Sequence, residues 1–443
     1  ISKDLIKWEE LPIAIYPDKD KYIFSGSAVV DASNTSGLKK GTMDPIVAIY
    51  TLHDMTKEKA GKIDVEQQDI AYSNDNGLTW HKFEEGNPVL KNPGIRDFRD
   101  PKVTWDATHK QWIMALAAQD RNQFYKSTNL KDWEYLSDFG KNIGAHGGVW
   151  ECPDFFEIKV QGTNETKWVL IQSLNPGGVN GGSGTQYFVG DFDGKTFTLD
   201  PNFEQKVSKE KGVWIDYGKD NYAGVTWNNI PDSDGRRLFI GWMSNWDYAQ
   251  QVPTTTWRSS MTIPREIQLI KKGNDYSLIN YPVREINKYI SKTSIKKSLK
   301  AKGNLSLVES GKIDLAQAIV NFNLKNLKQD TYTFSLSNSL GESLTFGINN
   351  EENYLFVDRS KAGKTDFSEK FAATISKAAL DGIQKEAAFK IILDKTSIEI
   401  FYNNGEKVLT EIFFTNEPFS SFSVSSNQEI ELSNLEINQL NIN

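Results

Sequence analysis

A short hairpin recurs four times in the first half of the chain, and it limits the possible folds more than any other feature of the sequence. Each copy is a polar turn followed by an aromatic residue; the turn contains Asp or Asn, which bond nearby backbone amides. The aromatic residues are Trp8, Trp80, Trp133 and Phe197, at separations of 72, 53 and 64 residues. Short apolar runs lie between them. A repeat of ~50–70 residues with several short strands predicts an all-β propeller built from four-stranded blades.

A change in the residue pattern after Pro282 predicts a second domain. The chain has 443 residues, whereas a single core stops growing at ~250–300 residues. Two clusters of Lys or Arg and the absence of Trp favour a linker over residues 283–303. From residue 304 on, β-branched and polar residues alternate, and the Asn-Asn-Gly at 403–405 is a typical hairpin turn. We therefore expect a propeller over residues 1–282 and a β-sandwich over 304–443.

Charge and composition exclude several classes of partner. The net charge of -7 gives no electrostatic reason to expect nucleic acid or an anionic membrane as a partner. The sequence also contains no run of ~18 apolar residues, the length needed to span a membrane. Cys152 is the single cysteine, so no intramolecular disulfide can form. The histidines lie far apart, without metal-ligand spacing, at His53, His81, His109 and His146. We expect neither a metal site nor a cofactor, and a neutral ligand suits the charge better.

Two carboxyl groups stand out because they lie in strand-like, otherwise apolar stretches. In the Phe-Arg-Asp-Pro segment at 98–101, the guanidinium of Arg99 would hold Asp100 ionised. Glu151 follows a tryptophan and precedes a cysteine, and apolar surroundings would favour its neutral form and make it a candidate general acid. Taken singly, the first segment also fits an ordinary turn salt bridge, and the second a surface glutamate at a strand end.

A third segment, Phe-Ser-Gly-Ser at residues 24–27, combines small residues with hydroxyl groups. Small residues let the backbone approach a ligand and a hydroxyl can bond it, although a plain strand turn is the alternative. Cleaving a glycosidic bond requires two flanking carboxylates, one as acid and one as nucleophile or base. Asp100 and Glu151 are candidates, and blade geometry would bring both to one central funnel.

These three segments, in this order and spacing, resemble the signature motifs of glycoside hydrolase family 32, which comprises the invertases, inulinases and levanases. The similarity covers essentially the whole chain and includes residues 241–246, 257–260 and 357–360. It implies a five-bladed β-propeller, with the first blade incomplete in this chain, followed by a C-terminal β-sandwich.

The resemblance also implies a role for individual residues. Asp100 would stabilise the transition state by binding fructosyl hydroxyls, and Arg99 would orient it and contact the same sugar. Glu151 would be the acid/base, protonating the leaving oxygen and later activating water. The subsite for the terminal fructose would be lined by Phe24, Ser25 and Trp242. The family reaction retains anomeric configuration through a covalent fructosyl-enzyme.

One family motif has no counterpart in this sequence. The family's nucleophile is the first aspartate of Trp-Met-Asn-Asp-Pro-Asn-Gly, which does not occur here. A Met-Asp-Pro at residues 43–45 resembles part of this motif, but it follows residues 24–27 and falls in a loop, so we reject its aspartate as the nucleophile. We expect the chain to begin downstream of the nucleophile, with a missing N-terminal segment completing blade one, and residues 1–443 alone to be inactive.

The pattern most resembles bacterial levanases and exo-inulinases, which implies release of fructose from the ends of levan or inulin, or from sucrose. It also implies a secreted, periplasmic or cell-surface protein. A fructan-binding propeller without activity is the alternative. A sialidase is a remote alternative: residues 73–80 match the Asp-box of that class, but the other hairpin copies lack the full box.

Overall fold

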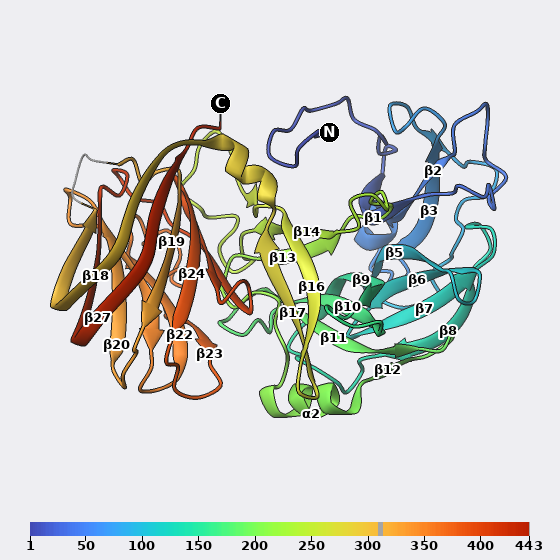
Figure 1. Cartoon of the computed structure of the whole chain (residues 1–443). Coiled ribbons are helices and arrows are strands. Elements are labelled where there is room, and N and C mark those ends of the chain that lie inside the picture. The colour runs from blue at the N-terminus through green and yellow to red at the C-terminus, as the bar shows by residue number, and fades with distance from the viewer. Residues whose placement is uncertain (309–312, 443) are drawn as a thin grey trace.

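The computed structural model describes residues 1–308 and 313–442, which form two β-rich lobes lying side by side (Figure 1). The N-terminal lobe runs from blue to yellow and the C-terminal lobe from yellow to red. The helices are short: α1 (Met55–Lys59), α2 (Pro201–Glu210) and the 3-10 helix η1 (Arg284–Tyr289). Among the described residues, no helix is both long and apolar enough to cross a membrane.

Four small antiparallel sheets build the N-terminal lobe, and apart from the two-residue strand at 260–261 their strands follow one another in chain order. The first contains β1 (Lys21–Val30), β2 (Ile46–Asp54), β3 (Glu66–Ser73) and β4 (His81–Lys82). The second contains β5 (Phe98–Asp106), β6 (Gln111–Ala118), β7 (Arg121–Ser127) and β8 (Glu134–Phe139). The third contains β9 (Val149–Lys159), β10 (Thr166–Asn175), β11 (Gly184–Phe192) and β12 (Phe197–Leu199). The fourth contains β13 (Tyr222–Thr226), β14 (Arg237–Met243), β15 (Ser260–Met261), β16 (Arg265–Lys272) and β17 (Asp275–Pro282). Such consecutive sheets are propeller blades, as the hairpin repeat predicts.

The three hairpin copies that end in tryptophan share one hydrogen-bond pattern. The indole N–H groups of Trp8, Trp80 and Trp133 each donate to the carbonyl three residues earlier, at 3.2, 2.9 and 3.2 Å. The copies that end at Trp80, Trp133 and Phe197 each join the third to the fourth strand of a sheet. They are therefore one structural feature repeated in successive blades. The count of five blades stays a prediction.

The two faces of a blade strand pack into different cores. In β6, Ile113 and Ala115 belong to the largest buried cluster, which extends toward the third blade. Trp112, Met114 and Leu116, on the other face, belong to a second cluster with the first blade. A strand covered on both faces is an uninterrupted apolar run, which is why β6 shows little alternation in sequence.

The innermost strands β1, β5, β9 and β13 contact one another in succession around the lobe. Each of these strands pairs with its neighbour through a register shift close to its N-terminal end. At these irregularities Asp100, Cys152 and Ala223 have positive φ angles of 64, 50 and 52°. Bulges redirect side chains, and residues with strained backbone cluster at functional sites. The four bulges therefore turn side chains toward one end of the central funnel.

The C-terminal lobe is a β-sandwich built from the remaining strands. They are β18 (Ile290–Val308), β19 (Ala318–Lys325), β20 (Thr331–Ser337), β21 (Ser343–Asn349), β22 (Tyr354–Lys361), β23 (Ser376–Ala379), β24 (Ala387–Asp394), β25 (Ser397–Tyr402), β26 (Lys407–Ile412) and β27 (Ser421–Leu440). The long strand β27 pairs with β20 through residues 421–425 and with β19 through residues 431–439. It therefore runs through both layers of the sandwich, with β18 beside it (Figure 1).

The linker expected over residues 283–303 is wrong for most of its length, because η1 and β18 occupy it. β18 pairs along β27, and in the described part of the chain it has no second strand neighbour. Its lysines are exposed, as is Ile295. Lysines are common on edge strands because they discourage pairing with other chains. The charge clusters therefore mark a sheet edge.

Candidate active site

One cavity, of about 640 Å³, opens where the innermost strands begin. Each of the four strands contributes the residues at or beside its bulge. The cavity is lined by every site residue expected from the sequence, namely Phe24, Ser25, Arg99, Asp100, Glu151 and Trp242. Residues separated by more than 200 positions in the chain thus meet because the blades share one axis.

The Glu151 carboxylate is held by two donors. Arg99 Nη2 donates to Oε1 at 2.9 Å, and the Tyr222 hydroxyl donates to Oε2. The prediction that Trp150 gives Glu151 apolar surroundings is wrong, since Trp150 is fully buried in the core on the other side of β9. Side chains alternate along a strand, so the side chain of Trp150, which precedes Glu151, faces away from it. The carboxylate that lines the cavity is therefore fixed by polar contacts.

Asp100 lies deeper than Glu151 and is almost fully buried. Its Oδ2 accepts a hydrogen bond from the backbone N–H of Cys152 at 2.9 Å, and its own N–H donates to Thr51 Oγ1 at 3.0 Å. Burial raises the pKa of Asp100 to about 6, although the Cys152 N–H and the charge of Arg99 act to lower it. The charge of Arg99 thus favours the ionised form of Asp100, as expected, but desolvation outweighs it and sets the pKa above the ordinary value.

Arg99 is instead the centre of a carboxylate cluster. Its Nη1 donates to Asp97 at 2.7 Å and to Glu66 at 3.1 Å, while Nη2 reaches Glu151. Glu66 also accepts the backbone N–H of Phe98 at 2.7 Å. Burial acts to lower the pKa of Arg99, but these carboxylates raise it above its ordinary value. The guanidinium is thus a permanent cation that orients Glu151.

Aromatic rings form the walls of the cavity. Phe24 stacks on His53 with ring centroids 4.4 Å apart and planes 12° apart. The ring centroid of Trp242 lies 5.1 Å from that of Trp246 and 6.3 Å from that of Tyr222. Phe24 and Trp246 are 39% and 47% exposed, so each leaves ring surface open to a ligand. Exposed rings beside carboxylates suit a sugar, because each ring offers an apolar face and each carboxylate accepts hydroxyl hydrogen bonds.

Several residues of the cavity are not evident from the sequence. The sequence assigns no role to Tyr222 or Ala223, and Glu66 begins β3, a strand away from the funnel. One signal could have found Tyr222. It stands at the start of the innermost strand of its blade, the position that Arg99 and Glu151 hold in theirs.

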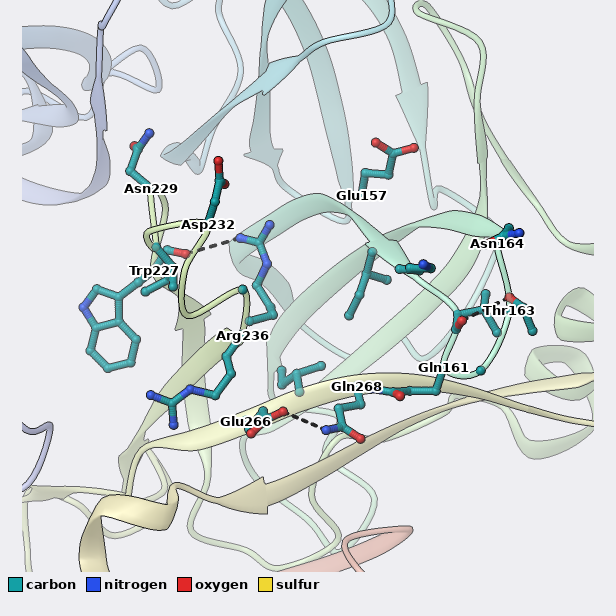
Figure 2. Close-up of a pocket in the computed structure, with 18 residues that line it drawn as sticks. Glu157, Gln161, Thr163, Asn164, Trp227, Asn229, Asp232, Arg236, Glu266 and Gln268 are labelled. Carbon is teal, nitrogen blue, oxygen red and sulfur yellow. Dashed lines mark hydrogen bonds between the residues drawn. The ribbon is translucent and has the colours of Figure 1, made fainter.

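A second cavity, of about 810 Å³, lies at the other end of β9 (Figure 2). Glu157, Trp227, Arg236 and Gln268 line it. Glu157 follows Glu151 by six positions on β9, which corresponds to roughly 20 Å in an extended strand. None of the site residues expected from the sequence lines this cavity. The two cavities are therefore chemically distinct.

Family models match both lobes of the chain. The Glycosyl hydrolases family 32 N-terminal domain matches residues 1–282, and the Glycosyl hydrolases family 32 C terminal matches residues 285–439. A levanase of Bacillus subtilis (strain 168) is 42% identical over 445 residues, which cover 99% of this chain. The chain spans 63% of the length of that levanase. An extracellular exo-inulinase of Aspergillus awamori is 36% identical over 442 residues, covering 94% of this chain and 80% of the inulinase.

Solved structures agree with the fold. An exo-inulinase from Aspergillus awamori superposes with a TM-score of 0.86 at 30% identity, covering 99% of this chain and 89% of the inulinase chain. A beta-fructofuranosidase from Schwanniomyces occidentalis, complexed with fructosyl-erythritol, gives a TM-score of 0.85 at 32% identity, covering 99% and 88%. Fold, motifs and family models thus agree, and the chain belongs to glycosyl hydrolase family 32.

Proposed function

We propose that this chain carries the acid/base half of a retaining glycoside hydrolase that releases fructose from fructan ends, with levan, inulin and sucrose as candidate substrates. The proposal rests on one observation: the Glu151 carboxylate, fixed by Arg99 and Tyr222, shares a cavity with the buried Asp100. The names of the relatives, a levanase and an exo-inulinase, support this substrate class. The Aspergillus relative is named extracellular, and we propose a secreted, periplasmic or cell-surface location.

In the proposed reaction the terminal fructose lies between Phe24 and Trp242, with Ser25 beside it. Glu151 protonates the oxygen that leaves and later takes a proton from water. Arg99 and Tyr222 keep the carboxyl group of Glu151 pointed at that oxygen; in its protonated form this group gives up the proton, and the carboxylate that results is the base in the second step. Asp100 accepts hydrogen bonds from fructosyl hydroxyls, and above a pH of about 6 its negative charge stabilises the positive charge that develops on the sugar.

The nucleophile of the reaction is proposed to lie in the family's Trp-Met-Asn-Asp-Pro-Asn-Gly motif. Residues 1–443 do not contain this motif, and we propose that they release no fructose by themselves. A chain that also carries the motif ahead of residue 1 is therefore the enzyme in which hydrolysis is measured, with residues 1–443 as the comparison. Hydrolysis by residues 1–443, at a verified mass, would show that another carboxylate is the nucleophile.

The role of Glu151 is tested by its replacement in that enzyme. Glu151→Gln should lower kcat/KM on a fructan by about 10²–10⁴-fold, the usual contribution of general acid catalysis. On a fructoside with a good leaving group the loss of kcat/KM should be much smaller, because departure then needs little protonation. Initial rates of fructose release and of leaving-group release measure the two values.

Glu157→Gln is the matched control, since Glu157 lies on the same strand in the cavity of Figure 2. It should leave both kcat/KM values unchanged. Equal losses on the two substrates in Glu151→Gln would remove Glu151 from the acid/base role.

A further inference from the structure

The segment just before β13 is held by the C-terminal sandwich. Asp220 Oδ2 accepts a hydrogen bond from Arg359 Nη1 at 2.5 Å and one from the Ile412 N–H at 2.9 Å. Its Oδ1 accepts from the Tyr248 hydroxyl at 2.6 Å, and its N–H donates to the Thr410 carbonyl at 3.1 Å. Asp220 is fully buried. Its carboxylate and backbone are therefore fixed mainly by groups on β22 and β26.

Arg359 lies on β22 of the sandwich and its guanidinium is fully occupied. Besides Asp220, it donates to the Phe371 carbonyl at 2.9 and 2.7 Å, to the Ile412 carbonyl at 3.0 Å and to the Tyr248 hydroxyl at 2.8 Å. Glu411 lies 2.8 Å away. Within the described residues, neither Arg359 nor Asp220 lines the active-site cavity. Arg359 therefore cannot act on a substrate directly.

The clamped segment leads into the active site in two residues. Asn221 is also buried, and its Nδ2 donates to Asp216 at 3.1 Å. The next residue, Tyr222, begins β13 and donates its hydroxyl to Glu151. Because the chain is fixed at Asp220 and again at Asn221, the backbone of Tyr222 has little freedom.

We propose that Arg359 of the sandwich is a positioning residue for catalysis: it fixes Asp220, and through it holds the Tyr222 hydroxyl on the Glu151 carboxylate. This proposal rests on the proposed function, in which Glu151 protonates the leaving oxygen. It gives the C-terminal lobe a part in the reaction that packing alone would not give it.

Another buried ion pair across the same two lobes serves as the control. Arg265 on β16 donates to Glu399 on β25 at 2.6 Å, and both side chains are buried. Glu399 also accepts the N–H of Ile263 at 2.8 Å, but it contacts no residue of the segment that leads to Tyr222. Glu399→Gln therefore leaves every bond of Asp220 in place. Because Arg265 also donates to Asp216, the acceptor of the Asn221 amide, this variant measures what a weakened interface alone transmits to Tyr222.

The first test observes Tyr222 without turnover, in residues 1–443 labelled with 3-fluorotyrosine. Tyr222→Phe identifies the resonance by its loss from the ¹⁹F NMR spectrum. Asp220→Asn and Arg359→Lys should each move that resonance, and Glu399→Gln should leave it in place. Thermal unfolding of each variant shows that it is folded at the temperature used. A resonance that stays in place in both clamp variants would overturn the proposal.

The second test measures kcat/KM in the chain that carries the nucleophile motif, with the same pair of substrates used for Glu151→Gln. Asp220→Asn should lower kcat/KM on the fructan by about 10- to 100-fold, the cost of displacing a catalytic group by about an ångström. The loss should be much smaller with the good leaving group and smaller again in Arg359→Lys, which keeps the charge. Glu399→Gln should match the unsubstituted enzyme.

Equal losses on both substrates in Asp220→Asn would overturn the proposal and show a structural role only. A failure of the proposed function has a different signature. In that case Glu151→Gln shows no leaving-group dependence, whereas the Tyr222 resonance still moves in the clamp variants.

Discussion

Asp100 combines burial with a strained backbone at one position. Asp100 is 7% exposed and its φ is 64°. The backbone N–H of Cys152 donates a hydrogen bond to its Oδ2. Such a group is costly to keep charged, and native proteins retain costly groups where function requires them. In the proposed reaction the charge of Asp100 is needed only as the sugar becomes positive.

The buried carboxyl predicts that Asp100→Asn stabilises the protein in a pH-dependent way. The pKa of Asp100 rises from 3.8 to about 6 on folding, so this group favours the folded state below pH 3.8 and that contribution is lost as pH rises through 6. The neutral amide carries no such loss. Asp100→Asn should therefore be more stable than the unsubstituted chain by about 1–3 kcal/mol at pH 7.5, and nearly equal at pH 3.5.

Urea unfolding of both proteins at several pH values measures this difference in free energy. Asp97→Asn is a suitable control, because Asp97 is a neighbour of Arg99 that is more exposed than Asp100. A difference between Asp100→Asn and the unsubstituted chain that does not change with pH would contradict the linkage.

At the scale of single elements, β1 shows how a bulge depends on one residue type. Its register with β2 shifts between Ile23 and Gly26. A Cβ on Gly26 would lie 2.0 Å from the Ile49 carbonyl oxygen and 2.6 Å from the Tyr50 Cα. Those are backbone atoms of β2, so they cannot move aside as a side chain can. Glycine therefore permits the close approach that turns Phe24 and Ser25 into the cavity.

Gly26→Ala should accordingly destabilise the protein by about 1–3 kcal/mol, the usual cost of forcing an extra group into a packed region. It should also weaken fructose binding, since the displaced β1 carries Phe24. Chemical denaturation and calorimetric titration with fructose measure the two effects. Ser25→Ala adds no atom at the bulge and should keep the stability. Unchanged stability in Gly26→Ala would mean that β1 and β2 separate at little cost.

At the scale of the whole molecule, buried charges join the two lobes. Arg265 on β16 is fully buried and donates to Glu399 at 2.6 Å, to Asp216 at 2.9 Å and to Thr410 at 2.7 Å. Arg359 makes the corresponding contacts from the sandwich side. Interfaces between domains are usually more polar than domain cores. Fully buried pairs of this kind fix the relative position of the lobes, since each partner has a single geometry.

Arg265→Met should destabilise the chain by about 3–5 kcal/mol, because two buried carboxylates lose their counter-charge. Guanidinium chloride unfolding followed by tryptophan fluorescence measures the loss. The exposed pair between Lys272 and Glu406, 2.6 Å apart, is the control. Lys272→Met should change the free energy of unfolding by about 0–1 kcal/mol. If both variants lose a similar amount of unfolding free energy, burial does not make the Arg265 contacts more important for stability than an exposed ion pair.

The sequence determined by itself the elements that depend on local chemistry. The hairpin turns at Trp80 and Trp133 recur because the turn residues and the indole N–H bond within one short segment. The family motifs pointed to Arg99, Asp100 and Glu151 for the same reason, because each motif is a short run of consecutive residues. The charge clusters at 283–303 suggested a linker where the structure has an edge strand, because an exposed edge strand and a linker have similar composition.

Only the tertiary structure decided how these residues act on one another. Arg99 bonds Glu151 across 52 positions, and Tyr222 bonds it across 71 positions, while Arg359 reaches Asp220 across 139. Desolvation of Asp100 likewise depends on everything packed around it. Contacts of this range are set by how blades and lobes pack, and packing is a property of the whole chain that no local pattern encodes.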